Sequence, residues 1–165
     1  MYYKSNSYDA MNEYTYWVYT QMIKAKMLKE VTALQDYGPQ PFIVDIEELT
    51  ENNDYFRRVY WTDNHFQLAL MSLNVGEDIG IEMHPDVDQF INIVDGEGLV
   101  MIGDRKDNLI HQANVSEGVA VIVPAGWWHN IKNVGDTPLK LYTIYAPPQH
   151  PAGTIHKTKE EAESE

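Results

Sequence analysis

Two stretches of this 165-residue chain decide its fold: Gly76-Glu-Asp-Ile-Gly-Ile-Glu-Met-His-Pro-Asp-Val-Asp-Gln89, and Gly118-Val-Ala-Val-Ile-Val-Pro-Ala-Gly-Trp-Trp-His-Asn-Ile-Lys-Asn133. In the first, Glu82 and His84 are two residues apart, so a strand over 81–84 would direct both side chains to one face. In the second, an apolar run reaches a Pro-Ala-Gly turn, and His129 is expected on the strand that follows. Each stretch therefore carries potential metal ligands near its end.

A third position joins these ligands through an expected hairpin. Gln89 opens the apolar run 90–94 and follows a Pro-Asp-Val-Asp segment that is typical of a turn. A hairpin would return Gln89 to the side of Glu82 and His84. The candidate ligand groups are then two imidazoles, one carboxylate and one amide, with Asp88 in reserve if Gln89 points away.

The spacing of these residues resembles the two motifs of the cupin family, G-x5-H-x-H-x(3,4)-E-x6-G and G-x5-P-x-G-x2-H-x3-N. The second motif is matched throughout, by Gly118, Pro124, Gly126, His129 and Asn133. The first is matched at Gly76, His84 and Gly96, with Glu82 in place of a histidine and Gln89 in place of a glutamate. The resemblance implies a mainly β fold, a double-stranded β-helix (jelly-roll) barrel whose four ligand positions face one metal.

The two departures leave a complete ligand set. Glu82, His84 and His129 form a two-His, one-carboxylate group, and Gln89 is a weak fourth ligand. A carboxamide is uncharged, but the carboxylate has in effect moved to position 82, so the total ligand charge is unchanged. We expect one divalent ion, and Zn, Fe, Mn and Ni all suit the donors. The alternative is a metal-free pocket in which Glu82 acts on a substrate as acid or base.

Composition restricts the partners. The chain has the length of one domain, 44% hydrophobic residues and a net charge of −13. That charge argues against nucleic acid and anionic membrane, and favours a small-molecule substrate or ligand. The chain has no cysteine, so it offers neither disulfide nor thiolate ligand. With no membrane-length apolar run and no signal-peptide pattern at its start, we expect the cytoplasm.

Residues 1–40 are expected to form an N-terminal helical extension. Apolar residues recur there at steps of three or four, at Met11, Tyr14, Val18, Met22, Ala25 and Leu28. The pattern predicts an α-helix over about 9–34. It either packs on the outside of the barrel or, because tyrosines and Trp17 crowd it, forms the interface of a homodimer.

The barrel is expected over residues 41–148, followed by a charged C-terminal tail over 149–165. The expected strands are 41–46, 55–61, 66–73, 90–94, 99–102, 109–115, 119–123 and 139–145, with a hairpin turn at 62–65 and a polar turn at 47–53. We expect His65, His150 and His156 at the surface, and His111 to be structural or exposed.

Four further side chains are candidates for the pocket. Arg57 could hold an anionic substrate group if it points inward, although the simpler expectation places both Arg57 and Arg58 on the solvent face. Tyr142 and Tyr145 are three residues apart, so one of them faces the cavity and offers a phenol for substrate binding or proton transfer. Trp127 could form an aromatic wall.

Three functions suit such a site. The first is an enzyme that isomerises or rearranges a small sugar-like or oxygen-rich substrate, with Glu82 or a tyrosine moving a proton; the cupin resemblance implies mannose-6-phosphate isomerase-like proteins as the nearest label. The second is an iron(II)-dependent dioxygenase. The third is a non-catalytic cupin that binds or senses a small ligand.

Overall fold

The computed structural model describes residues 36–164 together with Thr15, Trp17, Val18 and Met22. By its internal contacts the chain divides into two units, Met1–Gln35 and Asp36–Glu165. The four described residues of the first unit are helical, which agrees with the predicted N-terminal helix. The rest of that helix, and its suggested role in a dimer, lie outside the described residues.

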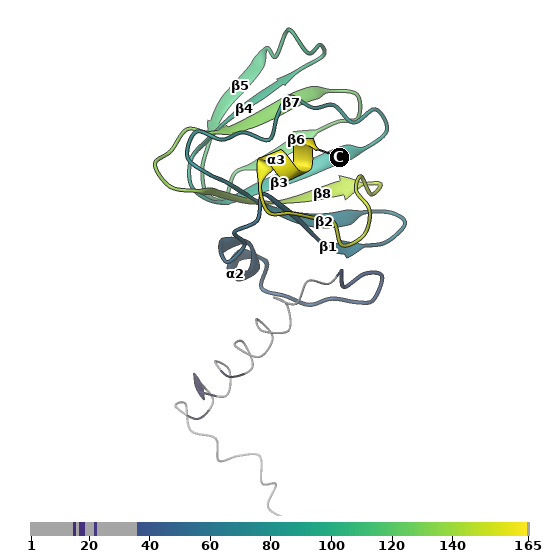
Figure 1. Cartoon of the computed structure of the whole chain (residues 1–165), viewed down its shortest axis with the longest axis vertical. Helices are drawn as coiled ribbons and strands as arrows, with labels where there is room; N and C mark the ends of the chain where they lie inside the picture. The colour runs from purple at the N-terminus through teal and green to yellow at the C-terminus, as the bar shows by residue number, and fades with distance from the viewer. Residues whose placement is uncertain (1–14, 16, 19–21, 23–35, 165) are drawn as a thin grey trace, which may run out of the picture. The chain divides into compact units, whose positions relative to one another are not determined.

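The second unit is built from two antiparallel sheets that lie in separate layers (Figure 1). The larger sheet has the order β6-β3-β8-β2-β1-β9 and the smaller sheet has the order β5-β4-β7. The strands are β1 (Arg57–Thr62), β2 (Gln67–Leu73), β3 (Asp88–Asp95), β4 (Gly98–Gly103), β5 (His111–Val115), β6 (Ala120–Val123), β7 (Trp128–Asn133), β8 (Leu139–Ala146) and β9 (Ile155–His156); the helices are α2 (Ile46–Glu51) and α3 (Lys159–Glu163). The predicted double-stranded β-helix is confirmed.

The interior is polar at one end and apolar at the other, because inward-facing residues stack in rows across neighbouring strands. One row, across β2, β8 and β3, consists of Gln67, Tyr145 and Gln89. Four residues further along the same strands, the row is Met71, Leu141 and Ile93, which belong to the main hydrophobic core. The apolar end stabilises the barrel, and the polar end is left for a site.

The strand predicted over 41–46 and the turn predicted over 47–53 are wrong. Residues 41–45 have no regular secondary structure, and α2 follows them. Asp45 caps this helix, since its carboxylate accepts a hydrogen bond from the Glu48 backbone N–H at 3.2 Å. Glu47 and Glu48 also lie in the first turn, where negative charge favours a helix. The capping sequence outweighs the weak apolar alternation before it.

Residues 149–164 lie along the barrel. β9 pairs with β1, with Arg57 opposite His156, and the Phe56 backbone N–H donates to the Lys157 carbonyl at 3.2 Å. His156 is only 3% exposed, so the expected surface position is wrong for this residue. The reason is backbone pairing: β1 would otherwise be a sheet edge, and an unpaired edge accepts a strand of almost any composition.

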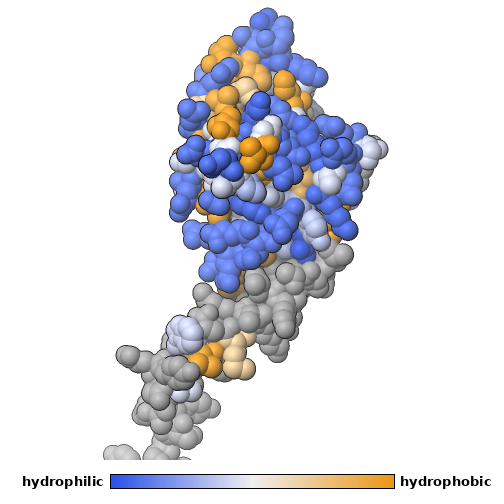
Figure 2. Space-filling view, turned by 60° about the vertical axis from the view of Figure 1, so that its left-hand side comes forward, coloured by the Kyte–Doolittle hydropathy of each residue, from blue (hydrophilic) through white to orange (hydrophobic). Residues whose placement is uncertain are grey.

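The outer surface agrees with the charge of the chain. Figure 2 shows a face of the second unit on which hydrophilic residues predominate and hydrophobic residues form small groups. Among the described residues, no helix is long and apolar enough to cross a membrane.

Asn133, the last residue of the second motif, holds two chain segments together. Its Nδ2 donates to the carbonyls of Leu73 and Thr137 at 3.0 and 2.8 Å, and its Oδ1 accepts from the Gly135 N–H at 2.9 Å. Asn133→Ala should therefore lower the free energy of unfolding by about 2–4 kcal/mol, because three buried or half-buried groups lose their partner.

Asn114→Ala is the matched control, because Asn114 lies exposed on β5. Urea unfolding followed by circular dichroism measures both variants. Equal stability of the two would contradict the structural role of Asn133.

Candidate metal centre

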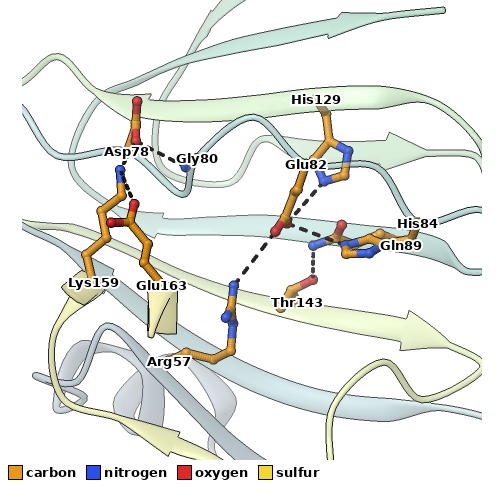
Figure 3. A network of polar contacts seen from close by, with 10 residues as sticks. All are labelled: Arg57, Asp78, Gly80, Glu82, His84, Gln89, His129, Thr143, Lys159 and Glu163. Carbon is orange, nitrogen blue, oxygen red and sulfur yellow. Dashed lines mark hydrogen bonds and ion pairs between the residues drawn. The ribbon is translucent and has the colours of Figure 1, made fainter. Parts of the chain in front are cut away.

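Glu82, His84 and His129 converge at the polar end of the barrel (Figure 3). The Glu82 Oε1 atom is 3.4 Å from His84 Nε2 and 3.4 Å from His129 Nε2. One ligand atom from each residue lies within 4.8 Å of the others. Atoms bound to a common ion at about 2.1 Å stand about 3.0–3.4 Å apart, so the two distances from Glu82 suit a metal.

Backbone hydrogen bonds hold the ligands in place. The Glu82 N–H donates to the His129 carbonyl at 3.0 Å, and the His129 N–H donates to the Glu82 carbonyl at 2.9 Å. This is an isolated bridge, so the strand predicted over 81–84 is reduced to one paired residue. The Gly126 N–H also donates to the His84 carbonyl at 2.8 Å. Gly126 has φ +82°, a conformation that side chains disfavour, which explains glycine in this turn.

Asp88 serves the turn and is not a ligand in this arrangement. Its Oδ1 accepts a hydrogen bond from the Ala125 N–H at 2.8 Å. This bond links the start of β3 to the Pro-Ala-Gly turn before His129.

His129 is oriented by its neighbour Trp127. Its Nδ1 lies 3.2 Å from the Trp127 carbonyl oxygen. A carbonyl can only accept, so Nδ1 carries a proton in this contact, and Nε2 faces Glu82. The Nε2 atoms of both His84 and His129 are buried without a hydrogen-bond partner, as expected for imidazoles that await a ligand.

Glu82 is held in its ionised form. Burial alone would raise the pKa of its carboxyl group, but the contacts with the His129 and His84 imidazoles and the charge of Arg57 outweigh burial and place the pKa well below its usual value. An ionised carboxylate beside two imidazoles fits a divalent cation.

Gln89 lies beside this group and has a free acceptor. Its Nε2 donates to Thr143 Oγ1 at 3.0 Å, while its buried Oε1 has no hydrogen-bond partner. The carboxamide is therefore fixed by its donor end and leaves the oxygen, which is the metal-binding atom of an amide, unused.

The two arginines of β1 are both buried, with 6% and 5% exposure, which contradicts the expectation of a solvent face. Arg57 points into the barrel, where its Nη2 lies 3.9 Å from Glu82 Oε2. Arg58 lies over the ring of Tyr60, with its Cζ 4.2 Å from the ring centroid. In place of water, the Arg57 guanidinium faces a carboxylate and the Arg58 guanidinium faces an aromatic ring.

Tyr145 is the tyrosine on the inner face. It is fully buried, and its ring meets the His84 ring edge-on at a centroid distance of 5.7 Å. Burial raises the pKa of its phenol to about 12 against the opposing effect of Arg57. Tyr142 lines an apolar groove on the outer face with Leu68 and Ile144, and so cannot act in this pocket.

His150 is a site residue that the sequence analysis missed. Its backbone N–H and carbonyl are clamped by the side-chain amide of Gln67 at 3.0 and 2.8 Å, and its ring lies 5.2 Å from the Tyr145 ring. Burial and the positive charge of Arg57 lower its pKa to about 4, so the ring is neutral near pH 7. A histidine between prolines in a charged tail carries no periodic signal, and only the clamp reveals its position.

The remaining candidates lie away from the ligands. The Trp127 side chain packs against the main hydrophobic core, with its ring 5.8 Å from that of His111. His111 and His65 are exposed, as predicted.

Comparisons with known proteins agree with the fold. A family model described as a cupin domain matches residues 69–145. The uncharacterized protein YrkC of Bacillus subtilis is 57% identical over 129 residues, which cover 78% of this chain and 69% of that protein. The crystal structure of BH2720 from Bacillus halodurans has 54% sequence identity and a TM-score of 0.79, covering 79% of this chain and 99% of the other. TT1209 from Thermus thermophilus shares the fold at 23% identity, with a TM-score of 0.54, covering 64% of this chain and 96% of the other.

Replacing either histidine ligand tests the centre. His84→Ala and His129→Ala should each remove most of the bound metal, because each deletes one of three strong donors. His111→Ala is the control, since His111 is an exposed histidine outside the ligand group. Elemental analysis by inductively coupled plasma mass spectrometry measures metal per chain. Full metal content in both ligand variants would show that the ligand set is wrong.

Gln89→Glu tests the fourth position. A carboxylate there should tighten divalent metal binding, because an anionic oxygen replaces a neutral one beside the ion. Competition with a chelator of known affinity measures the change. Unchanged or weaker affinity would place residue 89 outside the coordination sphere.

Proposed function

This chain belongs to the cupin superfamily, and we propose that it is a metal-dependent enzyme that isomerises or rearranges a small, oxygen-rich, sugar-like substrate. The proposal is carried by one observation: an ionised carboxylate and two imidazoles with free Nε2 atoms converge beside the buried hydroxyl of Tyr145. Such a combination serves chemistry in which a substrate oxygen is polarised while a neighbouring proton moves.

In this proposal, one group of residues binds the metal and another contacts the substrate. Glu82, His84 and His129 would hold a divalent ion, with Gln89 as a fourth donor, and the ion would supply Lewis-acid polarisation of a carbonyl or hydroxyl oxygen. Tyr145 keeps its proton at neutral pH, since its pKa is about 12, and can donate a hydrogen bond to a substrate oxygen. His150 is neutral and can accept a proton at Nε2, which is buried without a partner.

A second candidate is an iron(II)-dependent dioxygenase. It is favoured by the ligand types themselves, because two histidines and one carboxylate are the set used by non-haem iron enzymes with open coordination positions. The two candidates differ in whether oxygen is consumed.

Hydrogen exchange tests the first candidate. The metal-loaded protein should exchange carbon-bound hydrogen for deuterium in small hydroxy-aldehydes and hydroxy-ketones dissolved in D2O, as followed by proton NMR. Tyr145→Phe should slow this exchange about a hundredfold or more, because the inner phenol is lost. Tyr142→Phe, on the outer face, should leave it unchanged.

No exchange in any compound tested with stoichiometric metal would overturn the isomerase proposal. Oxygen uptake by the iron-loaded protein, measured with an oxygen electrode, would then favour the dioxygenase.

A further inference from the structure

A cavity of about 350 Å³ adjoins the metal centre and is closed on one side by the C-terminal helix. Glu82 and Arg57 line it from the barrel, and Lys159, Ala162 and Glu163 line it from α3. Figure 3 shows Arg57 rising from β1 toward Glu82, with Lys159 and Glu163 to one side. The segment predicted to be a tail therefore forms a wall beside the metal ligands.

The two cations of this cavity have different surroundings. Lys159 forms ion pairs with Asp78 and with Glu163, the latter at 3.7 Å, and the Asp78 carboxylate also accepts from the Gly80 N–H. The Lys159 charge is thus already balanced by two carboxylates. These contacts fix α3 against the loop that precedes Glu82.

Arg57, by contrast, is incompletely balanced. Its side chain is 7% exposed, and its Nε has no hydrogen-bond partner. Its carboxylate neighbour, Glu82, is 3.9 Å away, which is beyond hydrogen-bonding distance. A buried guanidinium normally has its donors satisfied, and its planar fork matches a carboxylate.

Metal binding would increase this imbalance. The single carboxylate of Glu82 cannot neutralise both a divalent ion and Arg57. The metal-loaded site would therefore carry a surplus of positive charge. Glu163, the other carboxylate that lines the cavity, is already paired with Lys159 and does not compensate Arg57. A ligand that brings its own negative charge is the arrangement that electrostatics favours.

We propose that this cavity is the substrate subsite and that Arg57 binds the carboxylate of a small monocarboxylic acid whose adjacent hydroxyl or carbonyl oxygen faces the metal ligands. The inference rests on the proposed function and adds a substrate class to it. A single charge is favoured over a phosphate dianion, because Arg57 is the one incompletely balanced cation among the described residues of the cavity, and Glu82 and Glu163 also line it. The apolar side chains of Phe56, Ile79 and Ala162 suit a short carbon chain.

Glycolate and its neutral isostere glycolamide form the probe pair. The cobalt-loaded protein is titrated with each while the visible absorption of the metal is recorded, and the metal-free protein is titrated by calorimetry. Glycolate should bind about tenfold to a hundredfold more tightly than glycolamide, the range for a hydrogen bond to a charged group. Equal affinities, or tighter binding of inorganic phosphate, would overturn the proposal.

Arg57→Gln distinguishes the arginine from the metal as the anion receptor. It should lose about tenfold or more of the glycolate affinity while retaining metal. Arg58→Gln, the adjacent buried arginine that lies over Tyr60, is the matched control and should bind glycolate as the unmodified chain does. Unchanged affinity in Arg57→Gln would overturn the proposal.

Two further measurements keep the test decisive. If circular dichroism shows that Arg57→Gln is unfolded, Arg57→Lys replaces it, because lysine keeps the charge without the planar fork. Arg57→Lys should bind glycolate more weakly than the unmodified chain. Equal affinity would overturn the proposal that the Arg57 guanidinium binds the carboxylate. Metal analysis separates the two proposals. Stoichiometric metal without a preference for glycolate rejects the subsite alone, whereas absent metal rejects the proposed function and leaves the calorimetric test of Arg57 in force.

Discussion

The whole site depends on a pair of backbone hydrogen bonds between Glu82 and His129, each of which donates to the other's carbonyl at 3.0 and 2.9 Å. They join a loop that has almost no regular structure to the start of β7. A second tie runs from the Gly126 N–H to the His84 carbonyl. These bonds hold the main chain of the three candidate ligands and do not involve their side chains. The three residues are therefore brought together before any ion binds. This pre-organisation lowers the entropic cost of binding a metal.

The interior of the barrel has an apolar end that forms the core and a polar end that holds the candidate site. Apolar rows such as Met71, Leu141 and Ile93 form the core at one end. At the other end the same strands contribute Gln67, Tyr145 and Gln89. Buried polar atoms without partners gather at that end, in the ligand imidazoles, the Gln89 oxygen and the Arg57 Nε. Each such atom costs stability, so their concentration in one place is the physical mark of a site built to receive something else.

Local signals were sufficient for most elements and failed in recognisable places. Turn residues and alternation located the hairpin of β1 and β2 and the strand that carries His129. α2 was missed because weak alternation was preferred to the cap formed by Asp45. His156 and His150 were misjudged for another reason: pairing of β9 with β1 buries His156, and the Gln67 clamp holds His150 half-buried against the barrel. The Gln67–His150 contact spans 83 positions, and the Arg57–His156 pair spans about 100. Contacts between such distant residues give no signal in the local sequence.

The sequence by itself determined the fold class and which residues form the candidate ligand group, because glycines, a proline and histidines at set spacings specify turns and donor atoms within short segments. Only the tertiary structure decided which tyrosine faces the pocket, that Arg57 is buried beside Glu82, and that the C-terminal helix walls the cavity. The physical reason is register. A shift of one residue turns a side chain to the opposite face of a sheet, and the partners that set the register lie far away along the chain.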